Sequence, residues 1–216
     1  MKISKESMIQ IYREQPGDYY MRQVRNKGLR SRLLSKRQRI IYDFTKKYYR
    51  GGKILDIGCG NSLWNRDNIS MVGLDICEAM LEHNSRRMSN FFPVKADISA
   101  GLPFKSGSVN IAVVTEVLEH FGSYGGLIAE IRRVLRKDGI AIVSVPYARL
   151  PGLWGILFPL WCRYKGWRDK DKYYSNRCGH VVGFDVGRIT RAFGKFTPLE
   201  LKNFNYLTIF CVARKE

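Results

Sequence analysis

Short apolar runs alternate with amphipathic stretches through the middle of this chain. The runs that predict buried β-strands lie at 53–57, 71–75, 92–96, 109–115 and 139–145. The stretches between them predict helices that begin near Ser62, Glu78 and Ser123. Strands that alternate with helices in this way are typical of a parallel sheet covered on both faces.

The C-terminal part of the chain continues the pattern. Asp185 is expected to cap a further helix that runs through Phe193. Two terminal strands, near 199–204 and 207–213, follow it and are joined by a turn at Asn205-Tyr206. The predicted fold class is therefore α/β, with a Rossmann-like, seven-stranded, mostly parallel sheet and helices on both faces.

Two regions lie outside this alternation. Residues 1–50 predict a basic N-terminal helical layer, which Pro16-Gly17 divides into a short and a longer helix. Tyr19 and Tyr20, next to this break, are placed to close over a ligand bound at the sheet. Residues 51–216 predict the second unit, a single domain with a cap insertion at about 147–180.

The cap insertion begins with a long apolar run. Residues 150–162 contain mostly apolar side chains, yet the run is too short to span a bilayer. It either packs inward as a cap over the substrate or lies at a membrane interface. In the second case Trp154 and Trp161 would lie at the level of the lipid headgroups.

A glycine-rich turn, in the sequence KILDIGCGNS at 53–62, follows the first predicted strand. Gly58 and Gly60 let the backbone come close to a ligand, and a helix starting at Ser62 would offer free N–H donors. Asp56 precedes the turn, and Asp75 ends the second predicted strand. An acid at that place can accept both hydroxyls of a ribose.

Further motifs follow in order. They are Ala96-Asp97-Ile98, Leu102-Pro103-Phe104, the run from Val113 to His120 and the run from Arg133 to Gly139. Together with the glycine turn, they make residues 51–146 resemble the class I S-adenosylmethionine-dependent methyltransferases. The similarity is greatest to the methyltransferase type 11 group, which includes quinone-biosynthesis methyltransferases. The resemblance implies S-adenosylmethionine as the cofactor.

The resemblance also implies which residues bind this cofactor. They are Asp56, Gly58, Cys59, Gly60, Asp75, Ile76, Asp97, Ile98, Thr115 and Glu116. Asp56 would lie near the methionine amino group, Asp75 would accept from the ribose hydroxyls, and Asp97 from the adenine amino group. Each acid could instead be a helix cap or a turn former, although the series over four strands favours the binding role.

Two residues are candidates for catalysis. The resemblance implies His180 as a base or substrate contact, with a structural hydrogen bond as the alternative. Tyr147, just after the fifth predicted strand, is the other candidate at that edge of the sheet. His120 is usually architectural at its place in the family, and His83 is expected at the surface of a helix.

The cysteines and the N-terminus give expectations about compartment. The 5 cysteines are odd in number and include no CxxC pair. This favours free thiols in a reducing compartment, without a disulfide framework or a bound metal. The first residues lack the apolar core of a signal peptide, so a cytoplasmic location is expected.

The net charge of +18 is unevenly distributed. Residues 51–146 contain 10 Lys/Arg and 10 Asp/Glu, whereas residues 1–50 contain 14 and 4, and residues 147–216 contain 13 and 5. The flanks thus carry +10 and +8. Both flanks are predicted to face an anionic partner, with solubility as the simpler explanation.

These features leave three hypotheses about function. The leading one is a methyltransferase that acts on a lipid-like or quinone-like small molecule reached from an anionic membrane surface. A nucleic-acid methyltransferase, such as one acting on tRNA, is the alternative, because basic and aromatic residues interleave at 163–168. Against it, Thr115-Glu116-Val117-Leu118 stands where an NPPY-like tetrad would follow the fourth strand. A cofactor-binding protein without catalysis is the third.

Overall fold

The structure is a computed structural model, which describes residues 5–25, 28–147, 153–168, 170, 179–205 and 207–216. For residues 5–8 and 153–158 it describes the backbone alone. A seven-stranded sheet with strand order β3-β2-β1-β4-β5-β7-β6 forms its centre. The strands are β1 Ile54–Ile57, β2 Met71–Asp75, β3 Phe91–Lys95, β4 Val109–Thr115, β5 Leu135–Pro146, β6 Thr197–Phe204 and β7 Thr208–Arg214.

The first five strands are parallel, and β7 runs antiparallel to both β5 and β6. The predicted fold class, a mostly parallel sheet of Rossmann-like order, is therefore confirmed. The helices are α1 Lys5–Arg13, α2 Tyr19–Arg25, α3 Leu29–Tyr48, α4 Glu78–Arg87, α5 Gly125–Val134, α6 Leu153–Arg168 and α8 Val186–Ala192, with 3-10 turns η1 Ile98–Ala100 and η2 Leu118–His120. Asp185 caps α8 as expected, because its side chain accepts from the Arg188 N–H.

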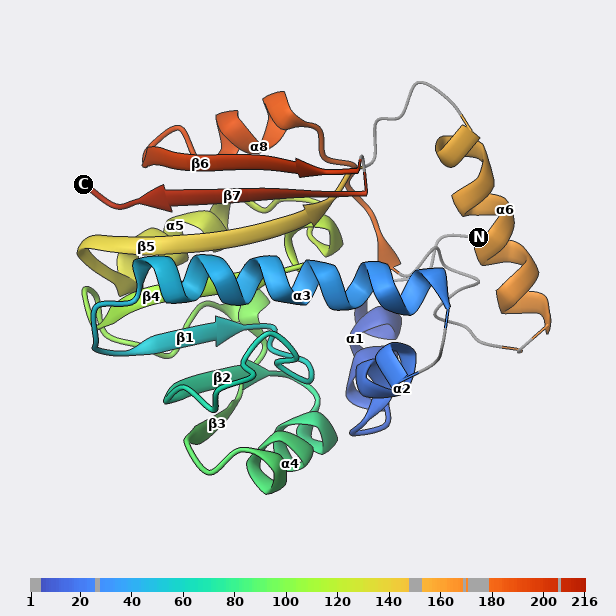
Figure 1. The fold of residues 1–216 in the computed structure, drawn as a ribbon, viewed down its shortest axis with the longest axis horizontal. Coiled ribbons are helices and arrows are strands. Elements are labelled where there is room, and N and C mark those ends of the chain that lie inside the picture. Colours follow the sequence, from blue (N-terminus) through green and yellow to red (C-terminus); the bar gives the residue numbers. More distant parts are fainter. Residues whose placement is uncertain (1–4, 26–27, 148–152, 169, 171–178, 206) are drawn as a thin grey trace.

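Helices cover both faces of the sheet (Figure 1). On one face, Ile41 and Phe44 of α3 and Leu81 of α4 pack on residues of the strands. On the other face, α5 and α8 bury their apolar sides in a second cluster. This burial explains why the strands are apolar on both sides, as β1 is at all four positions.

The prediction of a helix beginning near Ser62 is wrong. Residues 61–70 form an irregular segment, and Ser62 adopts a left-handed backbone with φ of 44°. The reason is that polar and aromatic side chains of this segment turn inward: Trp64 is 1 % exposed, and Asn65 exchanges two hydrogen bonds with Ile69. The turn therefore offers no helix N-terminus to a ligand.

The described residues of the N-terminal region form three helices, where two were expected. α1 and α2 lie at the end of the sheet toward which β1 points (Figure 1). Several contacts hold them there: the Asn61 side chain accepts from the Tyr20 N–H and donates to the Gly17 carbonyl. Tyr20 is thus placed over the glycine turn, as the sequence suggested.

Part of the predicted cap insertion lies outside the described residues, as does Tyr206 of the predicted turn. Within the insertion the structure describes α6, a 16-residue helix with Pro159 inside it, and Lys170. None of the helices in the described residues is long and apolar enough to cross a membrane.

A glycine inside β2 provides a test of how tightly the sheet packs. A Cβ at Gly73 would lie 2.1 Å from Cε2 of Phe91 and 3.1 Å from Sγ of Cys59. Gly73→Ala should therefore lower the free energy of unfolding by roughly 1–3 kcal/mol, measured by urea denaturation. Gly126→Ala is the control, because nothing lies within 4 Å of its Cβ position in α5 and alanine favours a helix. Equal stability of the two variants would contradict this packing.

Candidate active site

The glycine turn lies at the carboxyl ends of the parallel strands, which is where open α/β sheets bind ligands. Gly58 and Gly60 adopt left-handed φ values of 65° and 46°. The Gly60 N–H donates to the Asp75 carboxylate at 2.8 Å, and the Cys59 N–H donates to the Leu74 carbonyl at 3.0 Å. These two bonds attach the turn to the end of β2.

Both glycines are required by close neighbours. A Cβ at Gly58 would lie 2.7 Å from Cγ2 of Val117, and one at Gly60 would lie 3.1 Å from the ring of Tyr20. Cys59, between them, is 6 % exposed, and burial raises the pKa of its thiol well above the usual range. Cys59 therefore packs as a neutral side chain, and its contribution to a site is its backbone.

Asp56 is buried directly beneath this turn, with 1 % of its surface exposed. Its Oδ2 accepts from Ser62 Oγ at 2.9 Å and from Trp64 Nε1 at 2.8 Å, whereas Oδ1 is buried without a partner. Burial raises the pKa of this carboxyl to about 7, against the opposing effect of the two hydrogen bonds. An unsatisfied buried acceptor next to a glycine turn fits the positively charged amino group of a methionine tail.

The acids of the next two strands border the same edge. Asp75 accepts from the N–H groups of Gly60 and Cys77, and burial raises the pKa of its carboxyl. The Ala96 N–H donates to the Asp75 carbonyl, so Asp97 follows at the end of the adjacent strand. Asp97 accepts from the Ser99 N–H and caps η1, a structural role that leaves the predicted adenine contact untested.

Three further predicted cofactor residues lie at this edge of the sheet. Ile76 and Ile98 are half-buried after β2 and β3, and Ile98 also packs on the core. Thr115 is half-buried at the last position of β4. The structure thus brings the predicted cofactor residues of four strands to one edge.

Glu116 has a role that the sequence did not reveal. It adopts a φ of 56°, and its carboxylate accepts from Arg37 Nη1 at 2.8 Å and from Ser144 Oγ at 2.9 Å. The side chains of Arg37 and Glu116 are each 20 % exposed. Glu116 therefore joins α3 to the ends of β4 and β5, a link between residues 79 apart in sequence.

A cluster of Glu119, His120 and His180 lies just beyond β4. The Glu119 side chain is 1 % exposed, and neither of its oxygens has a hydrogen-bond partner. Its Oε1 lies 3.8 Å from His120 Nε2 and 3.9 Å from His180 Nε2. The N–H groups of Val181 and Val182 donate to the Glu119 carbonyl, which fixes the loop that carries His180.

Burial controls the charge of this cluster. It raises the pKa of Glu119 well above the usual range, and it lowers the pKa of His120 to about 4 and that of His180 to about 3. His120 Nδ1 lies 3.1 Å from the Gly179 carbonyl, which only accepts. Both imidazoles are neutral at physiological pH.

This cluster was only partly foreseen. His180 and His120 were singled out from the sequence, but Glu119, 61 positions before His180, was not connected with them. Among the described residues, the three offer one ligand atom each within 4.8 Å and could hold a metal ion. The expectation of no metal came from cysteine spacing alone, which carries no information about this trio.

The structure also gives the surroundings of Tyr147, Tyr12 and His83. Tyr147 follows β5, donates its N–H to the Leu207 carbonyl and forms an isolated bridge with Phe184, four residues after His180. Tyr12 of α1 contacts His120, with 2.9 Å between its hydroxyl and Nδ1. His83 is half-buried, 3.0 Å from the Met21 sulfur, rather than a surface residue.

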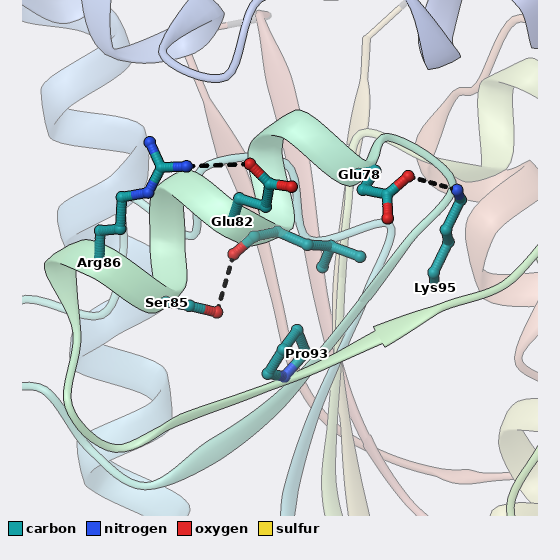
Figure 2. A pocket seen from close by; sticks show the side chains of 7 residues that line it. Glu78, Glu82, Ser85, Arg86, Pro93 and Lys95 are labelled. Carbon is teal, nitrogen blue, oxygen red and sulfur yellow. Dashed lines mark hydrogen bonds and ion pairs between the residues drawn. The ribbon is translucent and has the colours of Figure 1, made fainter.

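A shallow hollow between α4 and β3 is separate from these residues (Figure 2). It is lined by Glu78, Leu81, Glu82, Ser85, Arg86, Pro93 and Lys95. The charged groups pair with one another, Glu78 with Lys95 at 2.6 Å and Glu82 with Arg86 at 3.0 Å. None of the predicted site residues lines it, so we assign it no role in cofactor binding.

Comparison with known proteins agrees with this geometry. Residues 55–143 match the model of the family described as "Methyltransferase domain". An uncharacterized chloroplastic methyltransferase of Arabidopsis thaliana is 33% identical over 135 residues, covering 52% of this chain and 38% of the relative. A tRNA (carboxymethyluridine(34)-5-O)-methyltransferase of Xenopus tropicalis is 30% identical over 111 residues, covering 49% of this chain and 17% of the relative.

The fold also recurs in solved structures. A geranyl diphosphate methyltransferase, in complex with geranyl diphosphate and sinefungin, has a TM-score of 0.68 at 13% identity and covers 98% of each chain. Residues 55–143 thus match a methyltransferase domain in sequence, and the fold of the chain is that of a methyltransferase of known structure. The chain spans less than half the length of the two curated relatives named above.

The buried Asp56 gives a prediction about pH. Because its folded-state pKa of about 7 is above the unfolded value, its contribution to stability is fully present below about pH 4 and is lost as the pH rises through 7. In the protein without cofactor, Asp56→Asn should remove this loss of stability, because one amide oxygen can accept both hydrogen bonds. At about pH 8 the free energy of unfolding of the variant should exceed that of the wild type by a few kcal/mol. Urea unfolding at several pH values measures this.

The exposed Asp67, in the same irregular segment, supplies the control. Its hydrogen bond from Tyr42 lowers the pKa of its carboxyl, so Asp67→Asn should leave the decline of stability between about pH 5 and pH 8 in place. A decline that persists unchanged in Asp56→Asn would show that Asp56 does not titrate as its burial implies.

Proposed function

We propose that this protein transfers the methyl group of S-adenosylmethionine to a small, lipid-like or quinone-like acceptor reached from a membrane surface. The observation that carries the proposal is the enclosed cluster of Glu119, His120 and His180 at the end of β4. The side chains of His120 and His180 are 18% and 27% exposed, and α1 contacts His120 through Tyr12. An enclosed site suits a small acceptor that enters alone.

The cofactor is assigned to the edge built from β1, β2, β3 and β4. When bound, S-adenosylmethionine supplies an activated methyl group and needs mainly correct positioning and the exclusion of water. In the proposal, Asp56 Oδ1 accepts from the methionine amino group, and Asp75 from the ribose hydroxyls. The Gly58 and Gly60 backbone forms the cradle, and Tyr20 covers it.

His180 is proposed to receive the proton that the acceptor loses. Its imidazole is neutral, and its low pKa makes it a weak base. A weak base takes a proton only from a group that becomes acidic as it is methylated, such as a phenol, a quinol or an activated carbon. The buried Glu119 carboxyl lies 3.9 Å from His180 Nε2. Because burial raises the pKa of this carboxyl and keeps it protonated, it contributes no negative charge to the imidazolium.

A tRNA acceptor is the second candidate, supported by the Xenopus tropicalis relative and by the basic flanks. The match to that relative covers about half of this chain and 17% of the relative. The N-terminal helices pack across the carboxyl-end edge, and an unstacked base would need a deep open entrance there. We therefore rank the small acceptor first.

The deciding experiment is methyl transfer from labelled S-adenosylmethionine into the lipid, small-metabolite and RNA fractions of a host extract. Label in an organic-soluble product supports the proposal. Label confined to RNA would replace it with the tRNA candidate, and no transfer to any fraction, with intact cofactor binding, would support a non-catalytic protein.

The role of His180 predicts a rate effect without a binding effect. His180→Ala should lower kcat roughly 10²–10⁴-fold while the Kd of S-adenosylmethionine stays unchanged, by calorimetry. His83→Ala, on α4, is the matched control and should retain the wild-type rate. The assay is repeated after treatment with a chelator. Loss of cofactor affinity or of thermal stability in His180→Ala would make the residue structural.

The proposed role of Asp75 predicts an effect on cofactor binding. Asp75→Ala should weaken S-adenosylmethionine and its demethylated product at least tenfold, because charge-assisted hydrogen bonds contribute roughly 1.5–3 kcal/mol each. Since the carboxylate also holds the Gly60 N–H, both the ribose contact and the turn are affected. The control, Asp67→Ala, should bind S-adenosylmethionine with the affinity of the wild type. Unchanged affinity in Asp75→Ala would mean that the ribose lies elsewhere.

A further inference from the structure

One face of α6 exposes large apolar side chains. Leu160 and Tyr164 are each 54 % exposed, and Trp167 is 78 % exposed. Their spacing of four and then three residues places them on one side of a helix, along its length. Arg163 and Arg168 are also exposed and lie on the two borders of this stripe. We call these five residues the outer face of α6.

The opposite side of α6 attaches the helix to the protein. Cys162 is fully buried, and Gly166 is buried as well. Trp161 is half-buried, and the guanidinium of Arg30 lies over its ring at 5.0 Å. The helix thus has one side fixed near the start of α3 and the other side in solvent.

This arrangement changes which tryptophan can act at an interface. The sequence suggested Trp154 and Trp161 at the headgroup level. Trp161 is turned toward Arg30, and the Trp154 side chain lies outside the described residues. The exposed aromatic side chains of the described part of α6 are instead Tyr164 and Trp167. Tryptophan and tyrosine at a boundary between water and lipid bury the ring and keep their polar atom hydrated.

We propose that the outer face of α6 docks on an anionic lipid bilayer, with Leu160, Tyr164 and Trp167 in the interfacial layer. The charge around the face is complementary to such a surface. Arg163 and Arg168 flank the stripe, and Arg30 and Arg32 are exposed at the start of α3. Leu29, next to Arg30 in sequence, is 75 % exposed. An apolar stripe bordered by arginines is the pattern of helices that lie in the plane of a membrane.

The position of α6 connects this surface with the proposed function. α6 lies at the same end of the molecule as α1 and α2, beyond the carboxyl ends of the parallel strands (Figure 1). Docking there would turn the candidate active site toward the bilayer that dissolves a lipid-like acceptor. This link rests on the proposed function, whereas the bilayer contact itself does not depend on catalysis.

The test is co-sedimentation of the purified protein with vesicles of phosphatidylcholine alone and of phosphatidylcholine with phosphatidylserine, at low and high salt. Binding to the anionic vesicles is expected to exceed binding to the neutral ones and to fall with salt, because screening acts over about 10 Å at 0.1 M. Part of the vesicle binding should persist at high salt, because apolar insertion does not depend on charge. Absence of binding to anionic vesicles at low salt would overturn the proposal.

Two pairs of substitutions separate the contributions. Tyr164→Ala with Trp167→Ala should lower the salt-resistant binding roughly tenfold or more. Phe92→Ala is the matched control, because Phe92 is 56 % exposed on β3, away from α6. Arg163→Gln with Arg168→Gln should lower binding at low salt roughly tenfold. Arg136→Gln with Lys137→Gln, exposed where β5 begins, should have little effect.

A measurement on the wild-type protein guards against variants that fail to fold. Brominated lipids should quench the tryptophan fluorescence on anionic vesicles, and Trp167→Phe, which keeps an aromatic ring, should lose most of that quenching. Quenching unchanged in Trp167→Phe would place the contact elsewhere and overturn the proposal. Tight, salt-sensitive tRNA binding without vesicle binding, or a dimer that Leu160→Glu dissociates, would also overturn it by naming another occupant. Vesicle binding without methyl transfer to lipid would leave the docking surface intact and reject the acceptor.

Discussion

The burial of one carboxyl group, that of Asp56, is the constraint on which the candidate site depends. A buried acid must find hydrogen-bond donors, and Ser62 and Trp64 supply two of them. To do so, the segment after the glycine turn folds inward instead of forming a helix. The turn is then held between Asp56 below it and Asp75 beside it. A cation at Asp56 Oδ1 would stabilise the charged carboxylate, so cofactor binding and the protonation of Asp56 are physically linked.

The N-terminal helices contribute to both the core and the candidate site. α3 covers the sheet with Ile41 and Phe44 and reaches the end of β4 through Arg37. α1 contacts the Glu119–His120–His180 cluster through Tyr12. The candidate site is therefore assembled from both ends of the described chain. A methyltransferase domain without these helices would lack the cover over its glycine turn and the partner of Glu116.

The distribution of charge fits an enzyme whose centre and periphery have different partners. The core from 51 to 146 carries no net charge, and the excess positive charge belongs to the flanks. α6 combines that charge with exposed apolar side chains, whereas α3 uses its apolar side for the sheet. Of the described helices, α6 is the one that carries Tyr and Trp more than half exposed. Under our proposals the same flank that binds lipid also borders the entrance for the acceptor.

The sequence by itself determined the positions of the strands along the chain, their mostly parallel arrangement and the α8 cap. These features are local: apolar runs specify strands, and parallel strands bring their carboxyl ends together whatever lies between them. Asp56 and Gly60 lie at and just after the end of β1, and Asp75 ends β2; their cofactor roles were implied by the family resemblance. Only the tertiary structure decided what depends on distant partners. It removed the helix at Ser62, because Asp56 needs the donors of that segment. It paired Glu116 with Arg37, brought Glu119 to His180, and turned Trp167 rather than Trp161 outward, since these outcomes depend on which surfaces meet when the chain is packed.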